Sequence, residues 1–392
     1  MFTASLADGT LINLLQNNYS KEVLERLRNN DSFFCPDCKS PVMLKLGERK
    51  IHHFAHYQSA NCSIGHEPET ADHMAGKKLL YDWLCQQKLN PQVEHYISSI
   101  KQRADVFVEW KGWKIAFEYQ CSTISPSLLN SRTTSYVQAG YTPVWILSHK
   151  KANFKSFSKF QWSFICDFIN KHGVLLSLDT NMKSLYVTRP TPIATKQVIS
   201  SQKRLQLSST TSLTTCQRVI SEVQPIITYK QWLSIKNKNR SMIFRFIDKK
   251  KYALFQNLYL AHIPPPCFPV EAGWPVRAMH WIEQPCYMWQ LWILLDNIIQ
   301  KKSDLIFLND ILKNFYKRVQ MNHISLRTLP LVKHSKPEDA IEHYVQLLIE
   351  VGVLEEAGDY SYKIVRELLY PSHENEALDC DVKMARELIA HT

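Results

Sequence analysis

Two acidic residues, Asp105 and Glu118, have the residue types and the spacing that metal-assisted hydrolysis requires. Twelve residues separate them, and Glu118 begins a Glu-x-Gln motif that ends at Gln120. Carboxylate oxygens suit the hard ions Mg²⁺ and Mn²⁺, which polarise phosphate and activate water in phosphodiester chemistry. The sequence therefore predicts that Asp105 and Glu118 bind the metal and that Gln120 lies near the attacking water.

The stretch that holds this motif, residues 114–125, reads as a buried strand with polar residues on one side. Because strand residues alternate, Phe117 and Tyr119 point one way while Glu118 and Gln120 point the other. A buried carboxylate is costly unless it is paired. The alternative to a metal site is an ordinary half-exposed sheet face, on which Glu118 meets water.

A helix predicted over 69–87 supplies further candidate groups. Glu69, His73 and Lys77 recur at intervals of four residues, which places them on one face of this helix. Glu69 is a candidate third metal ligand, and Lys77 is an alternative to Gln120 for orienting the water or contacting the phosphate. His73 is either a neighbour of the metal ligands or a helix-surface residue.

Arg132 and Tyr136 lie one turn apart on a second helix, predicted over 125–140. We expect Arg132 to clamp a phosphate group, with Tyr136 stacking beside it or supporting it. In the alternative interpretation, Tyr136 belongs to the core and Arg132 merely covers it.

These residues need a helix–strand–strand–strand–helix–strand frame, which the sequence predicts between 67 and 188. A tight turn at residues 111–112 joins the second and third strands, so that Asp105 and Glu118 meet at one end of a hairpin. Ser125 is the expected N-cap of the second helix. The predicted elements are helices over 69–87, 125–140 and 160–173, strands over 92–97, 103–110, 114–121 and 142–147, and a hairpin over 174–189.

The N-terminal segment holds five residues typical of a zinc site. Cys35 and Cys38 form a C-x2-C knuckle, two predicted strands lead to His53 and His56, and Cys62 follows. Thiolates and imidazoles in this spacing close a tetrahedral site, and so small a module needs metal to fold. We predict a zinc ribbon with four of these five as ligands: Cys35 and Cys38 first, His56 and Cys62 next, and His53 as the alternate. The competing interpretation is a group of unrelated thiols and histidines.

Most of the net charge of +11 lies in residues 196–251, which contain twelve Lys and Arg residues but two acidic residues. Tyr229, Trp232 and Phe244 are interspersed among them. Such a block suits a polyanion, most simply nucleic acid. The alternative is a solvated basic linker.

The chain is long enough for several domains. Its apolar runs are too short to span a bilayer, and its first residues lack a signal-peptide pattern. We therefore expect a cytoplasmic protein without membrane insertion, whose ten cysteines are reduced thiols or metal ligands. The expected domains are a zinc-ribbon segment (1–66), an α/β domain (67–188), a Ser/Thr-rich linker (189–225) and a basic, mostly helical domain (226–392).

The order Glu69, Asp105, Glu118-x-Gln120 on this frame resembles the PD-(D/E)XK nuclease superfamily, which implies an α/β, restriction-endonuclease-like core. In that superfamily the Asp and Glu bind the metal, and a Lys two residues after the Glu positions the water. Gln120 stands at that position here and offers a neutral hydrogen bond instead of a positive charge. Over residues 5–190 the chain is similar to the competence protein CoiA family, through motifs such as CPDC, HHFAH, ETADHMAGKKLLYDWL and IAFEYQCSTISP.

This resemblance implies a bacterial protein that acts on incoming DNA, expected to be single-stranded, during natural transformation and recombination. The first hypothesis is a metal-dependent deoxyribonuclease with structural Zn²⁺, catalytic Mg²⁺ or Mn²⁺, and recombination or DNA-uptake proteins as partners. The second is a catalytically weak or inactive nuclease-fold scaffold that binds DNA and assists recombination. A zinc-ribbon adaptor, the third, leaves Asp105 and Glu118 unexplained.

Overall fold

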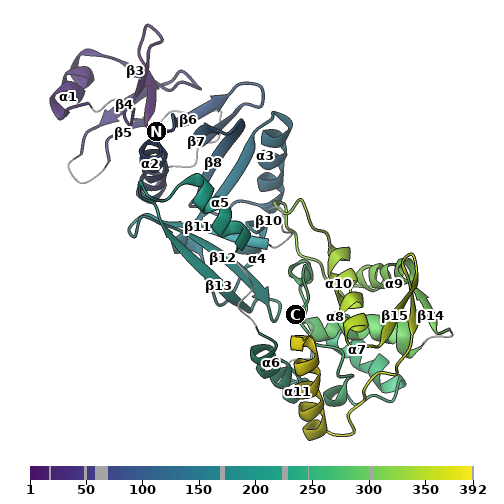
Figure 1. Ribbon diagram of the computed structural model, residues 1–392. Helices are drawn as coiled ribbons and strands as arrows, with labels where there is room; N and C mark the ends of the chain where they lie inside the picture. Colours follow the sequence, from purple (N-terminus) through teal and green to yellow (C-terminus); the bar gives the residue numbers. More distant parts are fainter. Residues whose placement is uncertain are drawn as a thin grey trace. The chain divides into compact units, whose positions relative to one another are not determined.

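The computed structural model shows a chain that folds into two compact units (Figure 1). The first unit comprises Met1–Ala152, Leu175–Val187 and Lys203–Ile220, and the second comprises Asn153–Val174, Thr188–Gln202 and Ser221–Thr392. The structure describes residues 1–16, 19–47, 51–57, 69–167, 173–222, 228–245, 247–300 and 303–390. Within these ranges, no helix combines the length and the apolar character needed to cross a membrane.

The first part of the chain forms a five-stranded antiparallel sheet with the strand order β2-β1-β3-β4-β5. Phe33 and Phe54 lie at its core, with ring centroids 5.0 Å apart. In the β4–β5 hairpin, Lys45 pairs with His53 and Val42 pairs with His56. The elements are β1 (Thr3–Ser5), β2 (Leu11–Asn13), α1 (Lys21–Asn30), β3 (Phe33–Phe34), β4 (Pro41–Lys45) and β5 (His53–His56).

The predicted helix-and-strand frame follows, with two helices flanking the strands (Figure 1). Its elements are α2 (Ala71–Gln86), β6 (Gln92–Ile97), β7 (Gln102–Trp110), β8 (Trp113–Gln120), α3 (Pro126–Gln138), β9 (Thr142–Ser148) and the turn η1 (His149–Lys151). Strands β6, β7 and β8 are antiparallel, whereas β9 runs parallel to β8. Ser125 caps α3 by accepting the Leu128 N–H at 3.2 Å, and Lys111 and Gly112 have positive φ in the predicted turn. The local signals that predicted these elements are therefore confirmed.

The sheet continues beyond β9 in the order β13-β12-β11-β9-β8-β7-β6. The predicted hairpin is present as β11 (Gly173–Asp179) and β12 (Ser184–Pro192). The linker predicted over 189–225 is wrong, because β13 (Val198–Gln206) and α5 (Leu213–Glu222) occupy much of that range. Strand β13 ends the sheet order and exposes many polar side chains, which gives it the composition of a linker.

The helix predicted over 160–173 is also wrong. Helix α4 (Lys159–Ser163) ends after five residues, and β10 (Cys166–Asp167) follows it and pairs with β11. The Asp167 carboxylate accepts the backbone N–H groups of Lys333 and His334, each at 2.7 Å. These long-range bonds favour an extended chain here, and local periodicity gives no sign of them. The remainder of the predicted helix, 168–172, lies outside the described residues.

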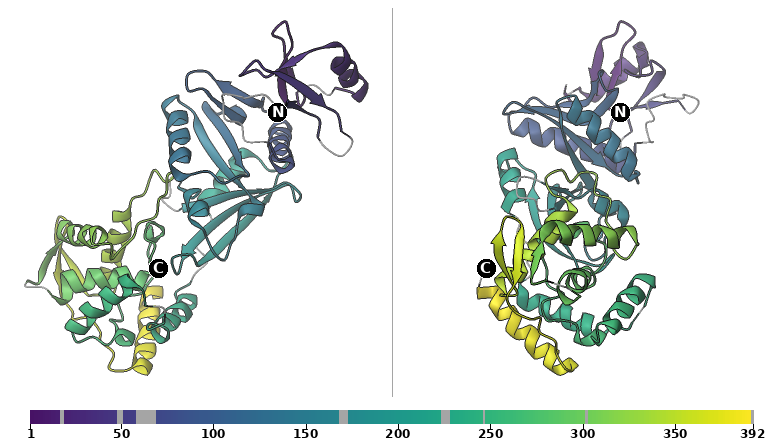
Figure 2. Two further views of the ribbon diagram at one scale, coloured as in Figure 1. Left: turned by 180° about the vertical axis from the view of Figure 1, so that it is seen from behind. Right: turned by 90° about the vertical axis from the view of Figure 1, so that its right-hand side faces the viewer.

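The second unit is mostly helical, as predicted, and surrounds a core rich in aromatic residues that includes Trp232, Trp274, Trp289, Trp292 and Tyr344. Besides α4, its helices in the described part of the chain are α6 (Tyr229–Ser241), α7 (Lys249–Leu260), η2 (Pro265–Cys267), η3 (Met279–Trp281), α8 (Cys286–Leu294), η4 (Leu295–Ile299), α9 (Leu308–Gln320), α10 (Pro337–Glu350) and α11 (Glu374–Ala390). A small sheet has the order β14-β16-β15, from β14 (Leu305–Phe307), β15 (Leu354–Gly358) and β16 (Ser361–Ile364). Helix α11 packs against α6 (Figure 2).

Candidate active site

Asp105 on β7 and Glu118 on β8 lie next to each other across the hairpin. Val106 pairs with Phe117, so Asp105 and Glu118 occupy the next position of the register. Glu118 is 4% exposed, which excludes the half-exposed sheet face. Burial, opposed by Arg132 and reinforced by the charge of Asp105, raises the pKa of Glu118 to about 7.

His73 on α2 binds Asp105 directly. The Asp105 Oδ2 atom accepts hydrogen bonds from His73 Nε2 at 3.0 Å and from the Tyr119 backbone N–H at 2.8 Å. Burial alone would raise the pKa of Asp105, but His73, Lys77 and the Tyr119 N–H lower it to about 2. Burial alone would lower the pKa of His73, but the negative charge of Asp105 outweighs burial, so the pKa of His73 is raised. His73 is therefore a neighbour of the acidic pair and not a helix-surface residue.

Glu118 is bound by two residues of α3. Its Oε1 atom accepts a hydrogen bond from Arg132 Nη2 at 2.7 Å and another from the Tyr136 hydroxyl. Tyr136 is completely buried and belongs to a core cluster, so it offers no surface for stacking. The Arg132 guanidinium also lies over the Trp145 ring, 5.0 Å from its centroid. Arg132 therefore reaches the site but forms an ion pair with Glu118.

Lys77 is a buried cation that joins two further carboxylates. It is 1% exposed, and its Nζ donates to Glu94 Oε1 at 2.7 Å and to Glu69. Burial opposes its charge, but Glu94, Glu69 and Asp105 together raise the pKa of Lys77. Glu69 also accepts from the Met1 amino group at 2.8 Å. Among the described residues, Glu69 does not complete a three-ligand cluster with Asp105 and Glu118.

Glu94 on β6 was missed by the sequence reasoning. Its carboxylate accepts the Phe2 N–H at 2.9 Å, the Thr3 N–H at 3.0 Å and the Thr3 hydroxyl at 2.6 Å, besides Lys77. Strand alternation would place the side chains of Val93 and Glu94 on opposite faces of the sheet, yet both side chains are buried. Glu94 has φ of +54°, which breaks the regular alternation. The strand also contains Gln92 and His95, so no local signal distinguished Glu94 from an exposed polar residue.

Gln120 lies at the end of β8, two residues after Glu118. Its Nε2 donates to the Ser122 carbonyl at 3.1 Å and to the Ser122 hydroxyl at 2.9 Å. These bonds tie the Gln120 side-chain amide to Ser122, two residues further along the chain. Lys77, in contrast, is a buried cation whose charge interacts with Asp105.

Three of the five predicted zinc ligands come together in the N-terminal sheet. The ligand atoms of Cys35, Cys38 and His56 all lie within 4.8 Å of one another, with Cys38 Sγ 3.3 Å from His56 Nε2. His53 is not in this group, and its Nδ1 lies 2.8 Å from the Ile51 carbonyl. Cys62 lies outside the described residues. The arrangement is a candidate Cys/His metal site.

The basic block is only partly a surface feature. Lys236 and Arg240 are fully buried, and both bind Asp381: Lys236 at 2.9 Å, and Arg240 through two bonds of 2.8 and 2.9 Å. Trp232 is buried too, and its indole N–H donates to the Gly273 carbonyl. These groups build the core, so the prediction that they face nucleic acid is wrong. Exposed cations of the block are Lys196, Lys203, Arg204, Arg218, Lys230, Lys238, Arg245 and Lys249.

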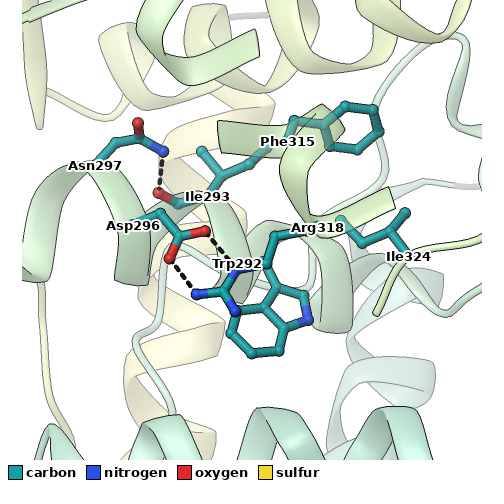
Figure 3. A pocket seen from close by; sticks show the side chains of 7 residues that line it. All are labelled: Trp292, Ile293, Asp296, Asn297, Phe315, Arg318 and Ile324. Atoms are coloured by element: carbon teal, nitrogen blue, oxygen red, sulfur yellow. Dashed lines mark hydrogen bonds and ion pairs between the residues drawn. The ribbon is translucent and has the colours of Figure 1, made fainter. Parts of the chain in front are cut away.

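A small hollow in the second unit is lined by an ion pair, Arg318 with Asp296 (Figure 3). Arg318 binds both oxygens of Asp296, at 2.8 and 2.5 Å, and its guanidinium lies 3.7 Å from the Trp292 ring centroid. Asn297 donates to the Ile293 carbonyl at 2.8 Å. The charged groups lining this hollow are paired with each other, and among the described residues only the buried Trp292 indole N–H has no hydrogen-bond partner there, so we assign no ligand to it.

The chain matches models of three consecutive protein domains. Residues 16–65 match the N-terminal domain of competence protein CoiA, residues 69–219 its nuclease-like domain, and residues 227–378 its C-terminal domain. The nuclease-like match thus includes β13, within the range predicted to be a linker. The chain is also 30% identical over 339 residues to competence protein CoiA of Bacillus subtilis (strain 168), over 84% of this chain and 89% of that protein. No solved structure matches the chain.

Proposed function

The chain belongs to the competence protein CoiA family, and from this premise we propose that it hydrolyses DNA phosphodiester bonds with a divalent metal ion during natural transformation. The observation that carries the proposal is the buried pair of Asp105 and Glu118 at one register position of β7 and β8. The frame of α2, β6–β9 and α3 is the order of elements expected of a restriction-endonuclease-like core.

The acidic pair offers oxygen atoms that suit a hard metal ion. Among the described residues, the hydrogen bonds to Asp105 fall on Oδ2 and those to Glu118 fall on Oε1. The second oxygen of each carboxylate is left to bind Mg²⁺ or Mn²⁺, which prefer oxygen ligands. When bound there, such an ion supplies a polarised phosphate oxygen and an activated water.

The chain's own cations complete the proposed site. Lys77 is held between Glu94 and Glu69. We assign to Lys77 the water-positioning role that the motif lysine plays in the PD-(D/E)XK superfamily, because Gln120 is bound to Ser122. His73 forms an ion pair with Asp105 and Arg132 forms one with Glu118, although burial still raises the pKa of Glu118 to about 7. Arg132 is also the group that can transfer from Glu118 to a phosphate when substrate enters.

The test is cleavage of labelled single-stranded and duplex DNA by the purified chain with Mg²⁺ or Mn²⁺. The isosteric changes Asp105→Asn and Glu118→Gln should each lower the rate at least about 100-fold, since each removes a metal ligand. Glu109→Gln, an exposed acid on the same strand β7, is the matched control and should cleave normally. Equal cleavage by all four proteins would refute the assignment.

A second comparison separates the two candidate water-orienting groups. Lys77→Met should abolish cleavage, whereas Gln120→Ala should change it little. A larger loss of cleavage in Gln120→Ala than in Lys77→Met would assign the water-orienting role to Gln120 instead.

A DNA-binding scaffold without cleavage is the second candidate function. The internal ion pairs of Asp105 with His73 and of Glu118 with Arg132 favour it, because a metal ion must compete with both. Under this hypothesis the wild-type chain binds DNA in the cleavage assay but leaves it intact, and Asp105→Asn changes nothing.

We also propose that the Cys/His site holds structural Zn²⁺. Cys35, Cys38 and His56 offer two sulfurs and one nitrogen in a group compact enough for a tetrahedral ion. Burial raises the pKa of the Cys35 thiol to about 12, so a cation is needed to hold it as a thiolate. Cys62 is the proposed fourth ligand.

A further inference from the structure

Helix α7 has one buried face and one exposed aromatic face. Leu254 and Leu258 are fully buried in the core of the second unit. Tyr252 and Tyr259, in contrast, are 57% and 80% exposed. Aromatic side chains normally bury most of their surface, so this face is suited to a partner that covers it.

The two tyrosines belong to a larger aromatic surface. Phe244, which is 56% exposed, packs edge-to-face against the half-buried Phe255, with ring centroids 5.6 Å apart. At about 100° per residue, Phe255, Tyr259 and Tyr252 follow one another around the helix. We call these four residues the α7 aromatic surface.

The charge around the α7 aromatic surface is positive. Lys249 is exposed one turn before Tyr252, and the exposed Arg245 follows Phe244 in the chain. Asp248 is the single acidic residue between positions 228 and 260 of the sequence. Its carboxylate caps α7 by accepting the Lys251 N–H at 2.8 Å. These positively charged surroundings therefore favour an anionic partner over a cationic or neutral one.

We infer that the α7 aromatic surface binds single-stranded nucleic acid, with bases stacked on Tyr252 and Tyr259 and phosphates beside Lys249 and Arg245. Base–aromatic stacking combined with cations that follow the backbone is the usual way in which proteins hold single strands. A duplex conceals its base faces in its own stack and would use only the cations. The inference deepens the proposed function, on which it rests, by naming the surface that holds the DNA.

The spacing of the tyrosines suits this role. Tyr259 lies seven positions after Tyr252, which is roughly 10 Å along the helix axis, so each ring can stack on a different base. Both rings lie outside the buried face that holds Leu254 and Leu258. Their replacement is therefore not expected to disturb the core.

The experiment measures binding of fluorescein-labelled oligo(dT) to the full chain by fluorescence anisotropy, in an Asp105→Asn background that prevents cleavage. Tyr252→Ala and Tyr259→Ala should each raise the Kd about 10-fold, whereas Tyr252→Phe and Tyr259→Phe, which keep the ring, should bind like the parent. Tyr360→Ala is the matched control, because Tyr360 is 71% exposed elsewhere in the same unit. Lys249→Gln should weaken the dependence of log Kd on log salt by about one unit of slope.

Unchanged oligo(dT) binding by both tyrosine-to-alanine variants would overturn the inference and assign this surface to another partner. Equal losses in the alanine and phenylalanine variants would also overturn it, since stacking needs only the ring. Cleavage by the wild-type chain is scored separately. If the chain binds through these tyrosines but never cleaves, the inference stands while the nuclease proposal fails.

Discussion

Removing Asp381 from the buried ionic cluster of the second unit is expected to be strongly destabilising. Asp381, Lys236 and Arg240 have fully buried side chains, and Asp381 is the acid that binds both cations. Below about pH 7, where Lys236 is protonated, Asp381→Ala would leave two buried cations without this partner, so the unfolding is measured there. Breaking a buried pair in this way typically costs about 3–5 kcal/mol, and the second cation places the expected loss at the upper end of that range.

Urea unfolding followed by tryptophan fluorescence measures this loss, because Trp232, Trp274, Trp289 and Trp292 all lie in the core of the same unit. Asp379→Ala, an exposed acid on the same helix, is the control and should change the free energy of unfolding by less than about 0.5 kcal/mol. A loss below about 1 kcal/mol for Asp381→Ala would refute the reasoning.

Three further changes test other parts of the account. Burial lowers the pKa of Lys236 to about 7 from its ordinary 10.5, so between these pH values the unfolded chain binds a proton that the folded chain lacks, and the free energy of unfolding should rise with pH. Urea unfolding at about pH 7.5 and about pH 9.5 should detect this rise in the wild type, and an equal rise in Lys236→Met would contradict it. Elemental analysis should find about one zinc ion per chain in the wild type and none in Cys35→Ser. The control Cys85→Ser, which removes an exposed thiol, should keep its zinc. Zinc retained in Cys35→Ser would exclude Cys35 as a ligand. Gly76→Ala would place a Cβ 2.1 Å from the Tyr119 ring, so thermal unfolding should show a loss of about 1–3 kcal/mol, and an unchanged melting temperature would show that α2 adapts freely.

The frame around the acidic pair could be predicted because its signals are local. The strand over 92–97 matches β6 residue for residue, and Ser125 caps α3 as its position indicated. Asp105 and Glu118 meet because a two-residue turn determines the register of the hairpin. Alternation and turn chemistry are enough to place these groups.

The partners of these carboxylates could not be predicted in the same way. Glu94 is buried through a positive φ, which alternation does not anticipate. Arg132 has the helical spacing of a phosphate clamp, yet its orientation toward Glu118 depends on the packing of α3 against the sheet. Lys236 and Arg240 read as surface charge because Asp381, their partner, lies far along the chain. In each case a long-range contact decided the outcome.

Manganese binding at the acidic pair is the measurement that tests the central claim most directly. Electron paramagnetic resonance can count bound Mn²⁺ in the zinc-loaded wild-type chain and in the double variant Asp105→Asn/Glu118→Gln. The account predicts at least about one more Mn²⁺ bound by the wild type, because each change removes a carboxylate ligand. Equal counts in the two proteins would contradict the account and leave the acidic pair as a structural feature of a DNA-binding scaffold.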